Sequence, residues 1–200
     1  MSPPTPRLSA PERRAHVLEC ACKVFSRGSY RGTTTAELAR SAGVTEPILY
    51  RHFDSKRDLY LACLEEIWTA LRARWDEALA AEPDPAAWLS VLGRTFFEAE
   101  RDEPVISALW VQALAEAGED EEIQRYMRDH VRDVHAYVTA VIERGQQEGG
   151  FLPDRDPRAE AWLFVSLGLL RMASLRLGGL VDEDFPAIVS ARRRWITGRD

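Results

Sequence analysis

This chain has few of the features that mark secreted or membrane-spanning proteins. Its three cysteines show no paired spacing, which favours a protein of the reducing cytoplasm over a disulfide scaffold. The longest apolar stretch, Ala161 to Leu170, has roughly half the length that a bilayer-spanning helix needs. The segment Met1 to Pro11 is polar and proline-rich, unlike a signal peptide, and we expect a disordered tail there.

Catalytic and metal-binding signatures are also missing. The sequence contains no G-x-S-x-G, HExxH, P-loop or glycine-rich dinucleotide motif. Cys20 and Cys22 are two positions apart on an expected helix, so they face different directions and do not form a metal site, and Cys63 is remote. We therefore expect a protein that is not an enzyme and that carries no cofactor or metal.

The charge is unevenly distributed along the chain. The net charge of the 200 residues is −6, which by itself argues against binding nucleic acid. Residues 1–60, however, hold ten basic and six acidic groups, a local charge of +4, and the remainder carries −10. Contact with phosphates requires local positive charge rather than a positive total. The N-terminal third is therefore the candidate nucleic-acid-binding part.

The hydrophobic periodicity predicts an all-α protein, because apolar residues recur at three- and four-residue spacing and no convincing strand pattern occurs. Helix breakers separate the segments, above all Pro83 to Pro85 and Gly149 to Pro153. The expected helices, nine in all, are an amphipathic helix over 12–27, two short helices within 34–52, and helices over 55–80, 86–101, 104–117, 121–147, 157–177 and 185–197.

Residues 34–56 carry the most informative spacing. Ala39 is small where one short helix must pass close to the next, Gly43 follows in the turn, and Leu49 is a buried aliphatic of the second helix. Thr34 opens a capping box with Glu37, and Thr45 is expected to cap the second helix. This arrangement predicts a helix-turn-helix, whose second helix, over 45–52, enters the major groove of DNA.

The run TTTAELARSAGVTEPILYRHFDSKRDLYLACL resembles the DNA-binding domain of the TetR (tetracycline repressor) family. The match covers roughly residues 12 to 64, and Tyr50-x-His52-Phe53-x-Ser55-Lys56 is its most specific part. The resemblance implies an N-terminal three-helix domain with the helix-turn-helix, followed by a larger helical domain for ligand binding and dimerisation, with about nine helices. On this basis we expect a tail over 1–11, a DNA-binding domain over 12–58 and a second domain over 59–200.

The resemblance also implies roles in DNA binding. Tyr50 and His52 would touch the DNA backbone or thymine methyl groups, and Lys56 would hold a phosphate at a helix start. Glu46 and Pro47 depart from the Lys-Gly pair that the family often has there. Glu46 either accepts a hydrogen bond from a cytosine, and so reads a C·G pair, or only stabilises the helix N-terminus, and both readings stay open. The expected DNA-binding residues are Thr34, Thr45, Glu46, Pro47, Tyr50, Arg51, His52 and Lys56.

The part after the motif is rich in tryptophan, and the resemblance implies a ligand cavity among its middle helices. Any single aromatic residue there is more simply explained by core packing, but together they favour an apolar or aromatic ligand. His130 and His135 are expected on an exposed, charged helix face. The candidate ligand-binding residues are Trp68, Trp75, Trp88, Phe96, Trp110, Gln112, Tyr126, Tyr137 and Trp162.

Residues 161–175 are apolar nearly all round, so that segment is expected to face its own core on one side and a second copy on the other. With the final helix it would form a four-helix interface, and two-fold symmetry would match a palindromic operator. We therefore expect a homodimeric DNA-binding transcriptional regulator, a repressor released from double-stranded operator DNA by a small-molecule effector, without a membrane partner. The alternative is a helical small-molecule-binding or enzymatic protein that uses the motif for interaction, and the sequence does not separate a repressor from an activator.

Overall fold

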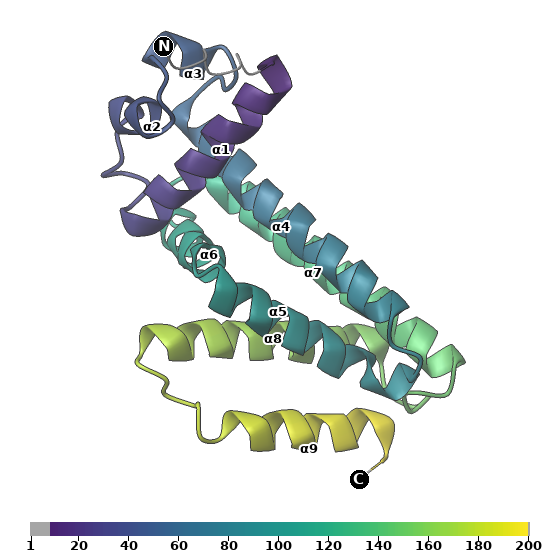
Figure 1. Cartoon of the computed structure of the whole chain (residues 1–200). Helices are drawn as coiled ribbons and strands as arrows, with labels where there is room; N and C mark the ends of the chain where they lie inside the picture. The colour runs from purple at the N-terminus through teal and green to yellow at the C-terminus, as the bar shows by residue number, and fades with distance from the viewer. Residues whose placement is uncertain (1–8, 200) are drawn as a thin grey trace, which may run out of the picture. The chain divides into compact units, whose positions relative to one another are not determined.

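The computed structural model describes residues 9–199, and the regular secondary structure of this part of the chain is all helical (Figure 1). The fold class expected from the sequence is therefore confirmed, as is the number of nine α-helices within the described residues. The helices are α1 (Ala10–Arg27), α2 (Thr35–Ser41), α3 (Glu46–Tyr50), α4 (Lys56–Ala80), the short 3₁₀-helix η1 (Pro85–Ala87), α5 (Trp88–Asp102), α6 (Val105–Glu116), α7 (Glu121–Gln147), α8 (Pro157–Arg176) and α9 (Phe185–Thr197).

The chain divides into two compact units. The first contains the residues up to 69 together with 105–123, and the second contains 70–104 together with 124–200. Helices α4 and α7 begin in the first unit and continue into the second. Helix α6 belongs to the first unit, whereas the sequence analysis assigned all of 59–200 to the second domain.

Helix α1 starts with a complete capping box. The Ser9 hydroxyl accepts a hydrogen bond from the Glu12 amide, and the Glu12 carboxylate accepts one from the Ser9 amide at 2.8 Å. Pro11 is tolerated in the first turn because the amide that it lacks has no partner within a helix at that position. Ala10 and Pro11, which the sequence analysis assigned to the tail, are thus helical, and residues 1–8 lie outside the described part.

The helix-turn-helix has the expected turn. The predicted capping box of Thr34 and Glu37 is present. Gly43 has a φ of 63°, and the Val44 amide donates to the Ala39 carbonyl at 2.9 Å. The side chains of Ala39 and Leu49 are buried at the crossing of α2 and α3. This spacing was therefore read correctly from the sequence.

Two details of α3 differ from the expectation. The helix ends at Tyr50, two residues before His52, because Arg51 and His52 already form a turn. Thr45 occupies the N-cap position, but its hydroxyl makes no capping hydrogen bond. With five residues, α3 is too short to be stable alone and depends on its packing against α2.

Helix α6 completes the core of the first unit. Leu109 and Ala113 of α6 are fully buried, and the Tyr60 hydroxyl of α4 donates to the Leu109 carbonyl at 3.2 Å. Phe25 of α1 packs edge-on against the Tyr60 ring, with ring centroids 5.0 Å apart. Burial of such aromatic side chains contributes about 1.5–3 kcal/mol each, which ties α1, α4 and α6 into one core.

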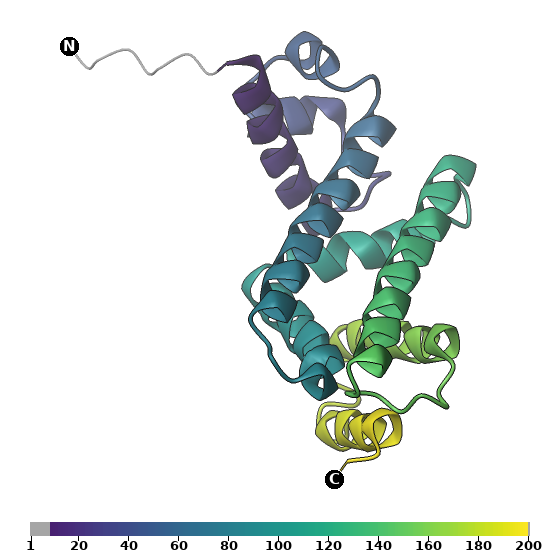
Figure 2. The ribbon, with the colours of Figure 1, turned by 90° about the vertical axis from the view of Figure 1, so that its right-hand side faces the viewer.

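The second unit contains the rest of α4 and α7 with α5, α8 and α9. Helices α8 and α9 lie side by side in both views (Figures 1 and 2). A buried ion pair between Glu160 of α8 and Arg192 of α9 joins them, and the Trp195 indole donates to Glu160 at 2.9 Å. In residues 9–199 no helix combines the length and the apolar character that crossing a membrane requires.

Gly43→Ala tests the turn of the helix-turn-helix. A Cβ at Gly43 would meet no neighbouring atom within 4 Å, so the expected cost comes from the positive φ alone. We expect the free energy of unfolding to fall by about 1–2 kcal/mol, and by less for Gly43→Asn, because Asn adopts this conformation more readily. Urea unfolding measures both. A fully stable Gly43→Ala protein would contradict the turn geometry.

Candidate nucleic-acid interface

Helices α2 and α3 present one exposed face on a buried support. Tyr50 is 45% exposed, and Glu46, Pro47 and Arg51 are also exposed. The support is apolar, because Leu49 and Phe53 are almost fully buried beneath this face. The backbone of α3 is therefore held while its outward side chains remain accessible to a partner.

Thr34 lies at the start of α2, as expected, but its hydroxyl is occupied. It accepts from the Glu37 amide at 3.2 Å and donates to the Glu37 carboxylate at 3.1 Å. The Thr34 amide also donates to this carboxylate, which lowers the pKa of Glu37. A phosphate at this position would have to compete with the carboxylate for the Thr34 hydroxyl.

The Glu46 carboxylate makes a contact that the sequence did not indicate. The Thr35 hydroxyl of α2 donates to it at 2.6 Å, across eleven positions of sequence. This hydrogen bond joins the first turns of α2 and α3 and restricts the direction of the carboxylate. Glu46 thus has a structural role, and its remaining lone pairs keep the base-reading hypothesis open.

The Lys56 ammonium points at the loop between α1 and α2. It donates to the carbonyls of Tyr30 at 2.9 Å and Thr33 at 3.1 Å, and it lies 4.5 Å from the centroid of the Tyr30 ring. Two of its three N–H groups are therefore used to anchor the loop that leads into α2. The phosphate contact that the resemblance implies for Lys56 would rely on the third.

Three residues that sequence analysis did not single out make side-chain contacts that hold this region together: Thr35, Arg31 and Arg57. Arg31 and Arg57 form ion pairs with acidic residues of segment 116–122, which lies in the same unit. The positive charge of 1–60 was counted from the sequence, but nothing in the sequence pairs these arginines with carboxylates more than 60 positions away. Only the packing of α6 against α1 and α4 brings them together.

The predicted ligand-binding residues are divided between the two units. Trp68, Trp110 and Gln112 belong to the first, where the Gln112 amide donates to the Gly28 carbonyl at 2.8 Å. In the second unit the Trp75 indole donates to the Leu92 carbonyl at 3.0 Å. The remaining members of the second unit are Trp88, Phe96, Tyr126, Tyr137 and Trp162.

Several of these aromatics serve packing. Trp75 is buried and stacks on Tyr137, with ring centroids 5.4 Å apart. Trp88 is buried and donates to the Glu82 carbonyl. Trp162 differs, because it is 47% exposed and stacks on His135.

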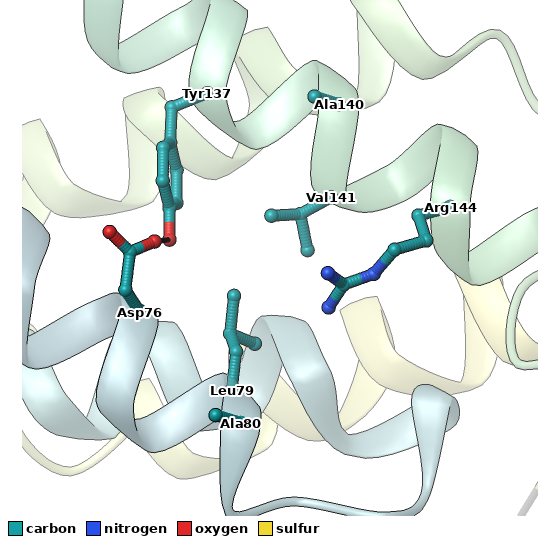
Figure 3. A pocket seen from close by; sticks show the side chains of 7 residues that line it. All are labelled: Asp76, Leu79, Ala80, Tyr137, Ala140, Val141 and Arg144. Carbon is teal, nitrogen blue, oxygen red and sulfur yellow. Dashed lines mark hydrogen bonds between the residues drawn. The ribbon is translucent and has the colours of Figure 1, made fainter.

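A hollow of about 320 Å³ lies between α4 and α7 in the second unit (Figure 3). Its two ends are polar: the Tyr137 hydroxyl donates to Asp76 at 2.7 Å, and the Arg144 side chain extends into the space from the other side. Burial, and then the bond to Asp76, raise the pKa of Tyr137, so its hydroxyl stays protonated. Of the nine predicted ligand residues, Tyr137 lines this hollow. The lining consists of Asp76, Leu79, Ala80, Tyr137, Ala140, Val141 and Arg144.

The expectation that both histidines are exposed was wrong. His135 is buried, with its Nε2 atom 2.9 Å from the Arg158 carbonyl. His130 stacks on Tyr126, and burial lowers its pKa to about 4, so its ring is neutral near pH 7. Among the described residues no three His, Cys, Asp or Glu side chains cluster in a way that could hold a metal ion.

Comparison with known proteins agrees with this architecture. A family model described as bacterial regulatory proteins of the tetR family matches residues 17–63, and a model described as BetI-type transcriptional repressor, C-terminal, matches residues 85–169. The first match contains the whole of α2, α3 and the turn between them. The second begins after the break that ends α4.

Individual relatives are distant but consistent. The HTH-type transcriptional regulator BetI of Rhizobium meliloti is 30% identical over 122 residues, which span 61% of this chain and 60% of that protein. The HTH-type transcriptional repressor KstR2 of Rhodococcus jostii is 27% identical over 86% of this chain and 84% of its own. A solved TetR-family regulator from Agrobacterium tumefaciens superposes with a TM-score of 0.79 at 24% identity, covering 94% of this chain and all of that one. The two family models and the shared fold lead to one conclusion: the chain belongs to the TetR family of bacterial transcriptional regulators.

Proposed function

We propose that this regulator is a homodimeric repressor that binds a palindromic operator through α2 and α3 and leaves it when a small-molecule effector binds. The observation that carries the DNA-binding part is the exposed face of α3, with Glu46 and Tyr50, and of Arg51 directly after it. This face lies above the buried crossing of Ala39 and Leu49. A rigid short helix with outward polar side chains suits entry into the major groove. The local charge of +4 over residues 1–60 supports phosphate contact.

The dimeric part of the proposal rests on exposed apolar side chains of α8, α9 and the loop between them. Large apolar groups gathered on neighbouring segments of one surface mark an interface in otherwise polar proteins. A second copy would cover them with the same surface, as in other two-fold assemblies. The exposed members are Trp162, Leu163, Leu169, Leu177, Leu180 and Trp195, each at least 37% exposed.

The effector part of the proposal concerns the second unit. The hollow between α4 and α7 has an apolar floor with Leu79 and Val141, and polar groups of Asp76 and Arg144 at its ends (Figure 3). Such lining suits a ligand that is mainly apolar with a polar group at one end. An effector that binds better to the arrangement unable to bind DNA would shift the dimer towards it, and operator DNA would weaken effector affinity by the same factor.

The alternative is a helical small-molecule-binding or enzymatic protein that uses the motif for interaction only. The family membership and the exposed α3 face count against it, and operator binding discriminates between the two. An activator with the same fold would bind DNA equally well, so reporter expression from the bound promoter is the measurement that separates it from a repressor.

Selection from a random pool of duplexes tests DNA binding. We expect the wild type to enrich a palindromic sequence with an affinity that falls steeply with salt. Arg51→Gln is expected to bind that duplex more weakly, with a slope of log K against log[salt] reduced by about 0.9, because one phosphate contact is lost. Arg101→Gln is the matched control, since Arg101 is exposed at the end of α5 and pairs with its exposed neighbour Asp102. Wild type that enriches nothing at low salt would refute the proposal.

Lys56→Met separates two roles of this lysine. We expect weaker operator binding, because the loop that leads into α2 loses its anchor on the Tyr30 and Thr33 carbonyls. A salt slope equal to that of the wild type would assign Lys56 to the loop alone, and a slope reduced by about 0.9 would add a phosphate contact. Fluorescence anisotropy over a salt series measures both quantities. Unchanged affinity would contradict both roles.

Light scattering after size exclusion tests the dimer. The wild type is expected at about twice the chain mass of 22.6 kDa. Leu163→Glu should shift the protein towards the monomer, because it places a charge in the proposed interface. Leu114→Glu is the control, since Leu114 on α6 is 47% exposed and Leu163 is 46% exposed. A monomeric wild type at micromolar concentration would overturn the two-fold model.

A further inference from the structure

Residues 116–122, from the last residue of α6 to the first turn of α7, are strongly acidic, and we call this segment the acidic turn. Five of its seven side chains are carboxylates: Glu116, Glu119, Asp120, Glu121 and Glu122. Like charges at this density repel one another unless cations compensate them. The compensating cations come from the loop before α2 and from the first turn of α4, both in the same unit.

Arg31 is the first of these cations. It lies in the loop between α1 and α2, and its Nε donates to Glu116 at 3.0 Å while another guanidinium nitrogen pairs with Glu119. The Glu116 side chain is only 14% exposed although it is charged. One further hydrogen bond strengthens the same junction: the Gln112 side-chain amide of α6 donates to the Gly28 carbonyl at the end of α1 at 2.8 Å.

Arg57 is the second cation, and it occupies the first turn of α4. Its guanidinium binds Asp120 at 2.9 Å and Glu122 at 2.6 Å. Asp120 also accepts hydrogen bonds from the backbone amides of Glu122 and Ile123, at 3.0 and 3.1 Å. The Asp120 carboxylate therefore caps the start of α7 and also forms an ion pair at the start of α4.

These contacts connect the segments before α2 and after α3 to α4 and α7, the two helices that continue into the second unit. Arg31 precedes α2 by four positions, and Arg57 directly follows Lys56, which anchors the same loop. Helix α7 runs from the acidic turn into the second unit, and α4 runs there from Arg57. A displacement of the first turn of α7 would therefore pull on Arg57 through Asp120.

The strength of the contacts suits a reversible connection. Arg31 is 57% exposed and Arg57 is 40% exposed, so each ion pair alone is weak and screened by salt. Four acidic partners acting on two arginines form a network, which holds a geometry better than single pairs do. Leu109 is fully buried in the core of the first unit, so α6 stays in place when individual ion pairs break and re-form.

We propose that the acidic turn is a relay, in which Arg31 and Arg57 are positioning residues that let the second unit set the orientation of α2 and α3. This inference rests on the proposed function, since it assigns a path to the coupling between effector and operator. The relay is reciprocal, so operator DNA bound at α3 must also change the second unit. That consequence makes the relay measurable without knowledge of the effector.

The test is amide hydrogen exchange of the full-length protein, measured without DNA and with a saturating concentration of the duplex that the wild type enriches in the selection. In the wild type we expect the duplex to change amide protection along α7 beyond residue 124 and in the second unit. In Arg31→Gln/Arg57→Gln this distant change should be lost, while protection of α2 and α3 by the duplex persists. Arg101→Gln should behave as the wild type, because its partner is the adjacent Asp102.

A charge exchange between positions 57 and 122 shows whether the relay requires the ion pair of Arg57 with Glu122 or only Arg57 itself. Arg57→Glu should lose the distant change, and Arg57→Glu combined with Glu122→Arg should regain part of it, because the exchange recreates an ion pair at the same place. Arginine at 122 can also reach Asp120, so the regain is expected to be incomplete. A double variant no better than Arg57→Glu would exclude the Glu122 pair from the relay.

The outcomes separate this inference from the proposed function. A wild type that does not bind any duplex refutes the DNA-binding function itself. A wild type that binds duplex but shows no distant change, or an Arg31→Gln/Arg57→Gln protein that shows the full distant change, overturns the relay and leaves DNA binding intact. Circular dichroism of each variant verifies that its helices are formed before exchange is measured.

Discussion

The close crossing of α2 and α3 is the constraint on which the rest of the first unit depends. Ala39 is small enough for the two backbones to approach, Gly43 supplies the positive φ of the turn, and Leu49 fills the space beneath. A helix of five residues has too few internal hydrogen bonds to hold itself, so tertiary packing determines its position. The exposed face of α3 is held in place because the side chains at this crossing are buried.

The loop between α1 and α2 transfers that order to the neighbouring helices. Lys56 holds it through two carbonyls, the Thr33 hydroxyl donates to the Ser29 carbonyl within it, and Arg31 ties it to the acidic turn. Each of these hydrogen bonds and ion pairs contributes little stability alone, but together they hold one short segment from different sides. Helices α2 and α3 therefore belong to the same compact unit as α6, and this unit extends beyond the N-terminal third of the chain.

The aromatic residues of the second unit mainly pack in its core. Trp75 and Trp88 are buried and satisfy their indole N–H groups with backbone carbonyls, which is the usual arrangement for a tryptophan in a core. Tyr137 joins packing and polarity, because it stacks on Trp75 and donates to Asp76 at the edge of the hollow. The buried pair of Glu160 and Arg192 joins α8 to α9 and so supports the apolar surface that these helices expose.

The sequence by itself determined the features that depend on local chemistry. Hydrophobic periodicity predicted the helices. The capping box of Thr34 with Glu37 and the turn at Gly43 followed from backbone requirements. The motif from Tyr50 to Lys56 indicated the family. Tertiary structure alone decided which groups meet over long separations: Thr35 with Glu46, Arg57 with Asp120, and the burial of His135. The physical reason is range. Capping and turn formation act within four residues, whereas ion pairs and ring contacts depend on how whole helices pack, which no short pattern encodes.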